Sequence, residues 1–399
     1  LPLLLLLLHG RPPVAARPLP CSRHSSSWRS PPPPPPNTTP TSITTFTPTP
    51  TATSTTTTGT TAAAAKEGDR GGTEAAPWRL EPSYTSRSRS SSARFLASSA
   101  AAYIHGHTLA VDGGNLNYLD EGPQGGEVIL AVHGNPTWSF YWRRLVTTYA
   151  DRYRVVVPDH IGCGLSDKPQ DWPYQLAGHR DNLVALIEHL DLQNVTLVVH
   201  DWGGAIAWGV AYGGMANGRV TRAIIANAPH PVLFPKLLYT NRQQREASQY
   251  FTEFRDPAND ALVREHGLAP LLMKAFEGQV MSRIEEDESA AMLKDWSDPD
   301  AAFGMLNYYR ASPMEVLPLD APYELPENYQ PYALPKLTLP TLVIWAMADE
   351  ALPPANLEGL DEVIADPEVV QVPDCGHFVQ WEAPTAFNAA VDAFLDRTG

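Results

Sequence analysis

The sequence predicts an α/β protein: a mostly parallel sheet flanked by helices, with a helical cap inserted between two sheet strands. From about residue 103 onward, short apolar runs alternate with turn residues and with segments of helical periodicity. This alternation is typical of strands and helices that follow one another along the chain. The alternation stops at about residue 230 and resumes at about residue 341, which indicates an insertion between two parts of one sheet.

Short apolar runs bounded by turn residues are expected to form buried strands. They lie at 128–132, 154–157, 195–199, 223–225, 342–345 and 369–372. Between the second and third runs, Leu183, Leu186, Ile187 and Leu190 recur at helical spacing, which places them on one face of a helix. The succession of strand, helix and strand predicts parallel pairing.

The insertion divides the folded part of the chain into three segments. We expect the first part of the core at 101–229, the cap at 230–338 and the second part of the core at 339–399. The cap segment combines helical stretches, proline-rich breaks and several aromatic residues. We expect it to cover the carboxyl edge of the sheet, where open α/β sheets bind ligands.

Residues 1–100 are expected to form a disordered, low-complexity extension. A run of prolines at 31–36 and a Thr/Pro tract to about residue 61 offer few large apolar side chains to bury, so folding could not offset the entropy of ordering. Residues 1–66 also lack acidic side chains, as organelle transit peptides do. A targeting segment, a linker and an over-extended reading frame remain open, and so does the choice between cytoplasm and an organelle (plastid or mitochondrion).

The charge and the cysteine content exclude several classes of protein. Residues 1–66 contain five basic side chains, and the rest of the chain holds 24 basic and 44 acidic ones, a net charge of −20. This acidic part of the chain repels the phosphate backbone of nucleic acid, so nucleic acid is not expected as the main partner. Three cysteines exclude a disulfide framework, and no apolar run reaches the roughly 20 residues of a membrane span. We expect a small apolar organic molecule and water as partners; the oligomeric state stays open.

Asp201 is the first candidate for a catalytic residue. It follows the predicted strand at 195–199 and precedes a predicted helix. A sharp strand-to-helix turn exposes the residue at its apex and points neighbouring N–H groups inward. Such turns usually carry glycine two residues before and two after the apex; here Gly203 is present but Val199 takes the earlier place. Taken alone, Asp201 could equally cap the following helix.

Further polar segments favour the catalytic interpretation. The loop at 133–136 follows the first predicted strand and can aim a backbone N–H at Asp201, completing an oxyanion hole. Asp349 comes just after the strand at 342–345, and His377 comes after the last strand. Nucleophile, acid and histidine then follow one another in the chain order of α/β-hydrolases.

The run from about residue 103 to 395 resembles the α/β-hydrolase superfamily, in the branch with an aspartate nucleophile that contains epoxide hydrolases and haloalkane dehalogenases. The segments HGNPTW at 133–138 and PDHIGCGLSDKP at 158–169 resemble the dehalogenases, and HDWGG at 200–204 is similar to both groups. The cap resembles the epoxide hydrolases, through NAPHP at 227–231, Tyr250 four residues before Phe254, and LNYYR at 306–310.

This resemblance implies hydrolysis in two steps, without a cofactor or a metal. Asp201 is ionised at neutral pH and can displace a leaving group from an sp³ carbon, forming an ester on the enzyme. His377, oriented by Asp349, would activate water to cleave that ester. The backbone N–H groups of Trp202 and Asn135 would stabilise the tetrahedral intermediate.

The leaving group separates the two activities. An epoxide leaves as an alkoxide and requires O–H donors, for which Tyr250 and Tyr309 match the two cap tyrosines of the family. A departing halide needs only N–H donors to stabilise it, and the side chains of Asn135 and Trp202 would supply them. The tyrosine pair favours opening of epoxides to vicinal diols. Haloalkane dehalogenation is the alternative, and a non-catalytic ligand receptor on the same scaffold is the least favoured one.

Simpler interpretations of the same residues stay open. Tyr308 and Tyr309 are adjacent, so one or both could only pack, and Tyr250 could belong to an apolar stripe with Phe251 and Phe254. His230, between two prolines, is typical of a surface loop. His160, His179 and His189 lack metal-ligand spacing, which indicates structural or solvent-facing roles. Further substrate contacts are expected from His133, Pro136, Trp138 and Pro229.

Overall fold

A computed structural model describes residues 106–212, 217–275 and 286–399. The extension expected at 1–100 lies outside the described residues. Within the described ranges, none of the helices combines the length and the apolar character that a membrane span requires.

The core is an eight-stranded sheet in the order β1-β2-β4-β3-β5-β6-β7-β8. The strands are β1 (His107–Val111), β2 (Gly114–Glu121), β3 (Val128–Val132), β4 (Arg154–Pro158), β5 (Val195–His200), β6 (Val220–Ala226), β7 (Thr341–Ala346) and β8 (Pro367–Val372). Pairing is antiparallel from β1 to β4 through β2 and parallel from β4 to β8. The expected mostly parallel sheet is confirmed.

The register of the central strands brings their carboxyl ends to one level. Val132 at the end of β3 pairs with Val199 of β5, and Ala226 at the end of β6 pairs with both His200 of β5 and Ile344 of β7. All side chains of β3, β5 and β7 are buried, as expected for parallel strands covered on both faces. The segments that follow these strands therefore meet at one edge of the sheet.

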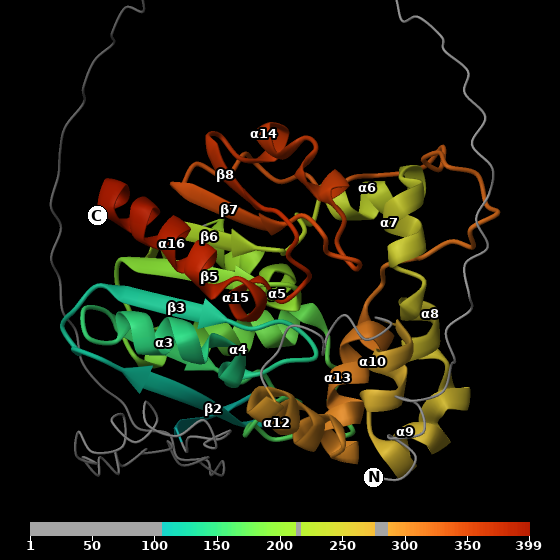
Figure 1. Ribbon diagram of the computed structural model, residues 1–399, viewed down its shortest axis with the longest axis horizontal. Coiled ribbons are helices and arrows are strands. Elements are labelled where there is room, and N and C mark those ends of the chain that lie inside the picture. Colours follow the sequence, from blue (N-terminus) through green and yellow to red (C-terminus); the bar gives the residue numbers. More distant parts are fainter. Residues whose placement is uncertain (1–105, 213–216, 276–285) are drawn as a thin grey trace, which may run out of the picture. The chain divides into compact units, whose positions relative to one another are not determined.

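Helices cover both faces of the sheet (Figure 1). On one face α4 (Leu176–His189) packs against α5 (Trp202–Ala211), which also packs on β3, β5 and β6. On the other face α3 (Arg143–Tyr149) packs on β4, and α16 (Pro384–Thr398) packs on β7, with α15 (Val379–Glu382) between α3 and α16. Leu183, Leu186 and Ile187 are buried on α4, as their spacing predicts.

The cap lies between β6 and β7 in the chain, beyond the ends to which the arrows of the parallel strands point (Figure 1). Its helices are α6 (Leu233–Thr240), α7 (Arg242–Ala247), α8 (Tyr250–Arg255), α9 (Asp260–His266), α10 (Ala269–Ala275), α12 (Glu286–Trp296) and α13 (Pro299–Ala311). α13 packs against α8, α9 and α12. The helical cap inserted between sheet strands is thus confirmed as part of the fold.

From residue 312 to residue 340 the chain forms neither helix nor strand, and we call this segment the strap. Arg245 of α7, with its side chain fully buried, holds the strap against the cap. Its guanidinium donates hydrogen bonds to two carbonyls of the cap and three of the strap, those of Leu238, Tyr239, Pro318, Ala321 and Pro322. It also stacks on the ring of Tyr323, 3.9 Å from its centroid.

The structure contains a hairpin of β1 and β2 that the sequence analysis did not predict. β1 lies at the edge of the sheet, and exposed side chains alternate along it with half-buried ones. β1 therefore lacks the continuous apolar run by which the central strands are recognised. In β2 the buried residues at 116–119 include Asn117, which interrupts the apolar run.

Candidate active site

Asp201 stands at the apex of the turn between β5 and α5. Its backbone has φ 52° and ψ −124°, a conformation that non-glycine residues rarely adopt outside functional sites. The turn is tight, since a Cβ on Gly203 would lie 2.4 Å from the carbonyl oxygen of Val132. Asp201 thereby presents its carboxylate at the carboxyl edge of the sheet while remaining 8% exposed.

Two backbone N–H groups bind this carboxylate. The N–H of Asn135 donates to Oδ1 of Asp201 at 2.8 Å, and the N–H of Trp202 also donates to it. Gly134 permits the approach, because a Cβ there would lie 2.5 Å from Cβ of Asp201. Burial raises the pKa of Asp201, and His377 and the two N–H groups oppose that rise. The pair of donors has the form of an oxyanion hole.

His377 lies between two carboxylates. Its Nδ1 is 2.8 Å from Oδ2 of Asp349, and its Nε2 is 3.6 Å from Oδ2 of Asp201. Burial lowers the pKa of His377, but the hydrogen bond and charge of Asp349 and the charge of Asp201 outweigh it and raise the pKa to about 9. The structure therefore brings together the three residues that the sequence proposes as a triad.

Asp349 is fixed by its own hydrogen bonds. Its Oδ1 accepts from the N–H groups of Ala351 and Leu352 at 2.8 and 2.9 Å. Its Oδ2 accepts from Nδ2 of Asn227 at 2.7 Å, and Oδ1 of Asn227 in turn accepts from the N–H of Ala346. Asn227 is part of the NAPHP segment at the entrance of the cap, and the sequence predicts no role in the site for it. The available signal was its place directly after β6, level with the ends of β5 and β7.

The two cap tyrosines meet beside the nucleophile. The hydroxyls of Tyr250 on α8 and Tyr309 on α13 are hydrogen-bonded to each other, and the indole N–H of Trp202 donates to Tyr309. Burial raises the pKa of both phenols, so both are protonated donors at neutral pH. The ring of Tyr309 is buried and that of Tyr250 is half-buried in a cluster of aromatic side chains, with Tyr309 4.9 Å from Phe251 and from Phe254.

Tyr308, the neighbour of Tyr309, faces away from this pair. Its hydroxyl donates to the carbonyl oxygen of Ile161 at 3.2 Å, and its ring stacks on His179 at 4.3 Å. The two adjacent tyrosines therefore divide the roles that the sequence left open for them. Tyr308 packs against the core, and Tyr309 packs on Trp202, the residue after Asp201, with ring centroids 5.1 Å apart.

The two N–H donors that a halide would use already bond to protein oxygens. Nδ2 of Asn135 donates to the carbonyl oxygen of Met305 on α13 at 2.8 Å. The indole N–H of Trp202 donates to Tyr309. The Asn135 side chain thus joins the core to the cap, and its backbone N–H reaches the nucleophile.

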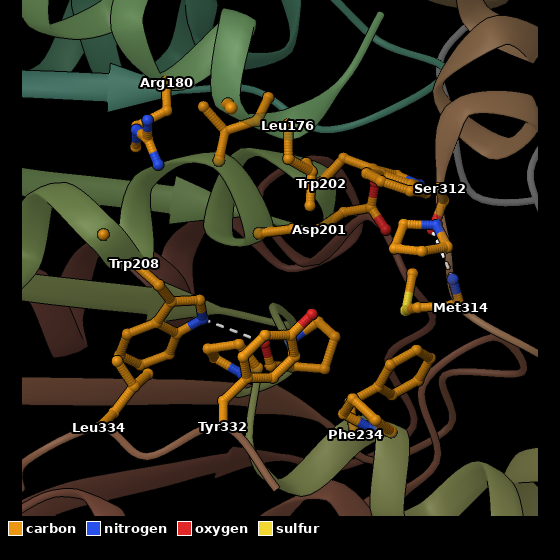
Figure 2. A pocket seen from close by; sticks show the side chains of 18 of the residues that line it. Leu176, Arg180, Asp201, Trp202, Trp208, Phe234, Ser312, Met314, Tyr332 and Leu334 are labelled. Carbon is orange, nitrogen blue, oxygen red and sulfur yellow. Dashed lines mark hydrogen bonds between the residues drawn. The ribbon is translucent and has the colours of Figure 1, made fainter. Parts of the chain in front are cut away.

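A cavity of about 600 Å³ opens beside Asp201, lined mainly by apolar side chains (Figure 2). Trp202, Tyr250 and Pro229 also line it. Three expected substrate contacts are not among its lining residues. The ring nitrogens of His133 bond to the backbone of Gly134 and His160, the carbonyl of Pro136 accepts from Trp296, and Trp138 stacks on Phe140.

The remaining histidines have structural surroundings. His160 and His179 are buried, and burial lowers the pKa of both. His230 is only 1% exposed, so the surface position that its flanking prolines suggested is wrong. Its imidazole is enclosed by Trp208 and Tyr212, with ring centroids at 4.7 and 6.2 Å.

Comparison with known proteins agrees with this geometry. The model of the alpha/beta hydrolase fold family matches residues 127–384. A cis-3-alkyl-4-alkyloxetan-2-one decarboxylase of Shewanella oneidensis is 32% identical over 304 residues, 73% of this chain and 88% of that protein. Haloalkane dehalogenase 2 of Mycobacterium tuberculosis is 29% identical over 282 residues, 70% of this chain and 90% of that protein.

One solved structure is more similar in sequence. It is an epoxide hydrolase of the α/β-hydrolase superfamily from metagenomes of hot environments, 53% identical, with a TM-score of 0.69. The match covers 72% of this chain and 97% of that one. The family match, the sheet topology and these relatives together show that the chain belongs to the α/β-hydrolase superfamily, in the branch of the epoxide hydrolases and haloalkane dehalogenases.

Proposed function

We propose that this hydrolase opens epoxides to vicinal diols through an ester on Asp201. The observation that carries the proposal is the hydrogen-bonded pair of Tyr250 and Tyr309, two neutral phenols beside the carboxylate. An epoxide oxygen leaves as an alkoxide and needs such O–H donors, whereas a halide does not. The 53% identity to an epoxide hydrolase supports the same choice.

In the first step a carboxylate oxygen of Asp201 attacks an epoxide carbon. A C–O ester bond forms, the C–O bond of the ring breaks, and the leaving oxygen takes a proton from the tyrosine pair. His377, with its pKa raised to about 9, is protonated beforehand. It can return a proton to the tyrosinate through solvent. Esterification also neutralises Asp201, which removes one of the charges that raise the pKa of His377.

In the second step His377 acts as the base. It takes a proton from water, and the hydroxide attacks the ester carbonyl of Asp201, whose oxyanion is held by the N–H groups of Asn135 and Trp202. The intermediate collapses, the diol oxygen takes the proton from His377, and the carboxylic acid of Asp201 gives its proton back to the imidazole. The sum of both steps is epoxide and water to diol.

The test is a side-by-side assay of the purified protein with an aryl epoxide, a primary bromoalkane and a cis-3,4-dialkyloxetan-2-one. The last two probes represent the activities named for relatives of this chain. We expect diol from the epoxide, and a double Tyr250→Phe, Tyr309→Phe variant should lose about 100-fold or more, a typical scale for general acid catalysis.

Asn135→Ala is the matching variant for the alternative activity. It removes the side-chain amide and keeps the backbone N–H. The rate of bromide release would therefore fall if that amide bound the halide. Bromide release without diol, or full epoxide turnover by the double tyrosine variant, would overturn the proposal. Loss of carbon dioxide from the oxetanone with no diol from the epoxide would contradict it as well.

A further inference from the structure

The backbone that carries His377 belongs to no regular element. β8 ends at Val372 and α15 begins at Val379, so the ladder of a sheet or a helix does not fix residues 373–378. In such a loop each backbone N–H and C=O must find a partner elsewhere. The carbonyl oxygen of His377 lies 2.9 Å from Nε2 of His200, and the N–H groups on either side of His377 need acceptors of their own.

Glu382 supplies these acceptors on both sides of His377. Its Oε2 accepts from the N–H of Gly376 at 2.9 Å, and its Oε1 accepts from the N–H of Phe378 at 3.0 Å. Both are hydrogen bonds to a charged group, which are about twice as strong as neutral ones. Because one carboxylate binds both neighbours of the histidine, rotation of the peptide unit on either side would break one of the two bonds.

Gly376 leaves room for this carboxylate. A Cβ on Gly376 would lie 2.8 Å from Oε1 and 2.9 Å from Oε2 of Glu382, which is too close for van der Waals contact. The three heavy atoms nearest to that Cβ all belong to the Glu382 carboxylate. A larger residue before His377 would therefore have to displace Glu382.

Glu382 belongs to a helix that is fixed to the core. It is the last residue of α15, which packs against α3 and α16. Val379 and Gln380 of this helix are fully buried, and the indole N–H of Trp381 donates to the carbonyl oxygen of Tyr141 at 2.9 Å. The carboxylate thus ties the loop of His377 to the core.

Capping of α15 accounts for only half of this arrangement. Phe378 is the N-cap residue of α15, and a glutamate in the first turn of a helix can accept from the N–H of the N-cap residue. That bond could serve the helix alone. Gly376 lies two residues before the N-cap, on the other side of His377, and its bond to Glu382 adds nothing to the helix.

The charge of Glu382 acts in the same direction as its hydrogen bonds. Burial lowers the pKa of His377, whereas Asp349, Asp201 and Glu382 raise it. Once Asp201 is esterified it carries no charge, while Asp349 and Glu382 still do. Glu382 therefore helps to stabilise the imidazolium that forms when His377 takes a proton from water.

We propose that Glu382 is a positioning residue for the second step, in which it holds the loop so that His377 can activate water. This inference rests on the ester of Asp201 in the proposed function, and Glu382 acts through His377. In the first step the carboxylate of Asp201 attacks without the help of a base. Removal of the Glu382 carboxylate should therefore slow hydrolysis of the ester and spare its formation.

The test follows the ester over time. Protein is mixed with an aryl epoxide and quenched at intervals, and intact-protein mass spectrometry gives the rates of ester formation and ester hydrolysis. Glu382→Gln keeps the size of the side chain but replaces one acceptor oxygen by an amide group that only donates. We expect hydrolysis to slow roughly tenfold or more, as for loss of a hydrogen bond to a charged group, and formation to keep its rate. Glu127→Gln is the matched control, because Glu127 pairs with Arg222 at 2.8 Å just before β3, at the amino end of that strand.

Gly376 offers a second variant. Gly376→Ala should also slow ester hydrolysis, because the added Cβ displaces the carboxylate of Glu382. In a Glu382→Ala background the same change should cost little more, since the two residues act through one contact. Equal slowing by Gly376→Ala in both backgrounds would overturn the inference. Glu382→Gln would overturn it as well if it slowed both steps alike or slowed neither.

A measurement without turnover separates this inference from the proposed function. The proton between Nδ1 of His377 and Asp349 should give a downfield proton NMR signal, identified by its loss in His377→Gln. We expect Glu382→Gln to shift this signal and Glu127→Gln to leave it in place, even in a protein that opens no epoxide. An unchanged signal in Glu382→Gln contradicts the positioning role, whether or not the wild type forms diol.

Discussion

Nδ1 of His377 lies 2.8 Å from Oδ2 of Asp349, while the opposite ring nitrogen faces Asp201 at 3.6 Å. The three side chains follow β8, β7 and β5, whose carboxyl ends meet at one edge of the sheet. The imidazole can therefore hold a proton between a carboxylate that orients it and a carboxylate that reacts.

Asp349 should be the carboxylate on which His377 depends. Asp349→Asn keeps the shape of the side chain but removes its charge, so we expect turnover to fall by about 1,000-fold or more, as in other triads. Glu350→Gln is the control, because Glu350 is the neighbouring carboxylate and is exposed. Steady-state kinetics of both variants distinguish the two carboxylates. A loss of turnover in Glu350→Gln but not in Asp349→Asn would show that Glu350 is the partner of His377.

Asn227 should act by positioning Asp349. Asn227→Ala removes the hydrogen bond at 2.7 Å to Oδ2, and a hydrogen bond to a charged group is worth about 1.5–3 kcal/mol. We expect kcat to fall roughly tenfold to hundredfold and the pH–rate profile to shift. Asn182→Ala, another buried asparagine whose amide donates to the carbonyl of Asp112, should leave that profile in place. Identical profiles for wild type and Asn227→Ala would contradict the positioning role.

The raised pKa of His377 makes stability depend on pH. Since the folded pKa, about 9, is above the ordinary value of 6.5, protonation stabilises the folded state. That stabilisation is complete below pH 6.5 and is lost as the pH rises through 9, by on the order of 3 kcal/mol at about 1.4 kcal/mol per pKa unit. Urea unfolding of wild type and His377→Gln across this window measures it. If the free energy of unfolding changed with pH to the same extent in wild type and in His377→Gln, this prediction would be wrong.

Arg245 should hold the strap in place. Arg245→Met leaves the carbonyls of Pro318, Ala321 and Pro322 without this donor. Because each of these is a hydrogen bond to a charged group, we expect a loss of about 3–5 kcal/mol in the free energy of unfolding. Arg242→Met on the same helix removes an exposed ion pair with Glu246 and should change stability by less than about 1 kcal/mol. Equal denaturation midpoints for the two variants would show that the strap does not need Arg245.

The sequence predicts those parts of the molecule that a short stretch of the chain determines by itself. Strands such as β3 are continuous apolar runs, and Asp201, Asp349 and His377 each follow a strand, so fold and triad candidates can be named in advance. The roles proposed for these residues stay predictions. Asn227 belongs to the NAPHP segment, but its hydrogen bond to Asp349 was not predicted because the two residues are distant in the chain.

The same limit applies to residues whose surroundings come from distant segments. The burial of His230 depends on Trp208 and Tyr212 of the preceding helix region, and flanking prolines cannot reveal it. His133 lies in the loop that holds Asn135, yet its ring bonds to the backbone of Gly134 and His160. Sequence motifs locate such a loop and leave open which of its side chains meets the ligand.

The central claim is that Asp201 becomes esterified, and one measurement tests it most directly. In His377→Gln the attack of Asp201 on the epoxide remains possible while activation of water is lost, so the ester should accumulate. Intact-protein mass spectrometry after mixing with an aryl epoxide should show an added mass equal to one substrate, and peptide mapping should place it on Asp201. A variant that stays unmodified under conditions in which wild type forms diol would contradict the account.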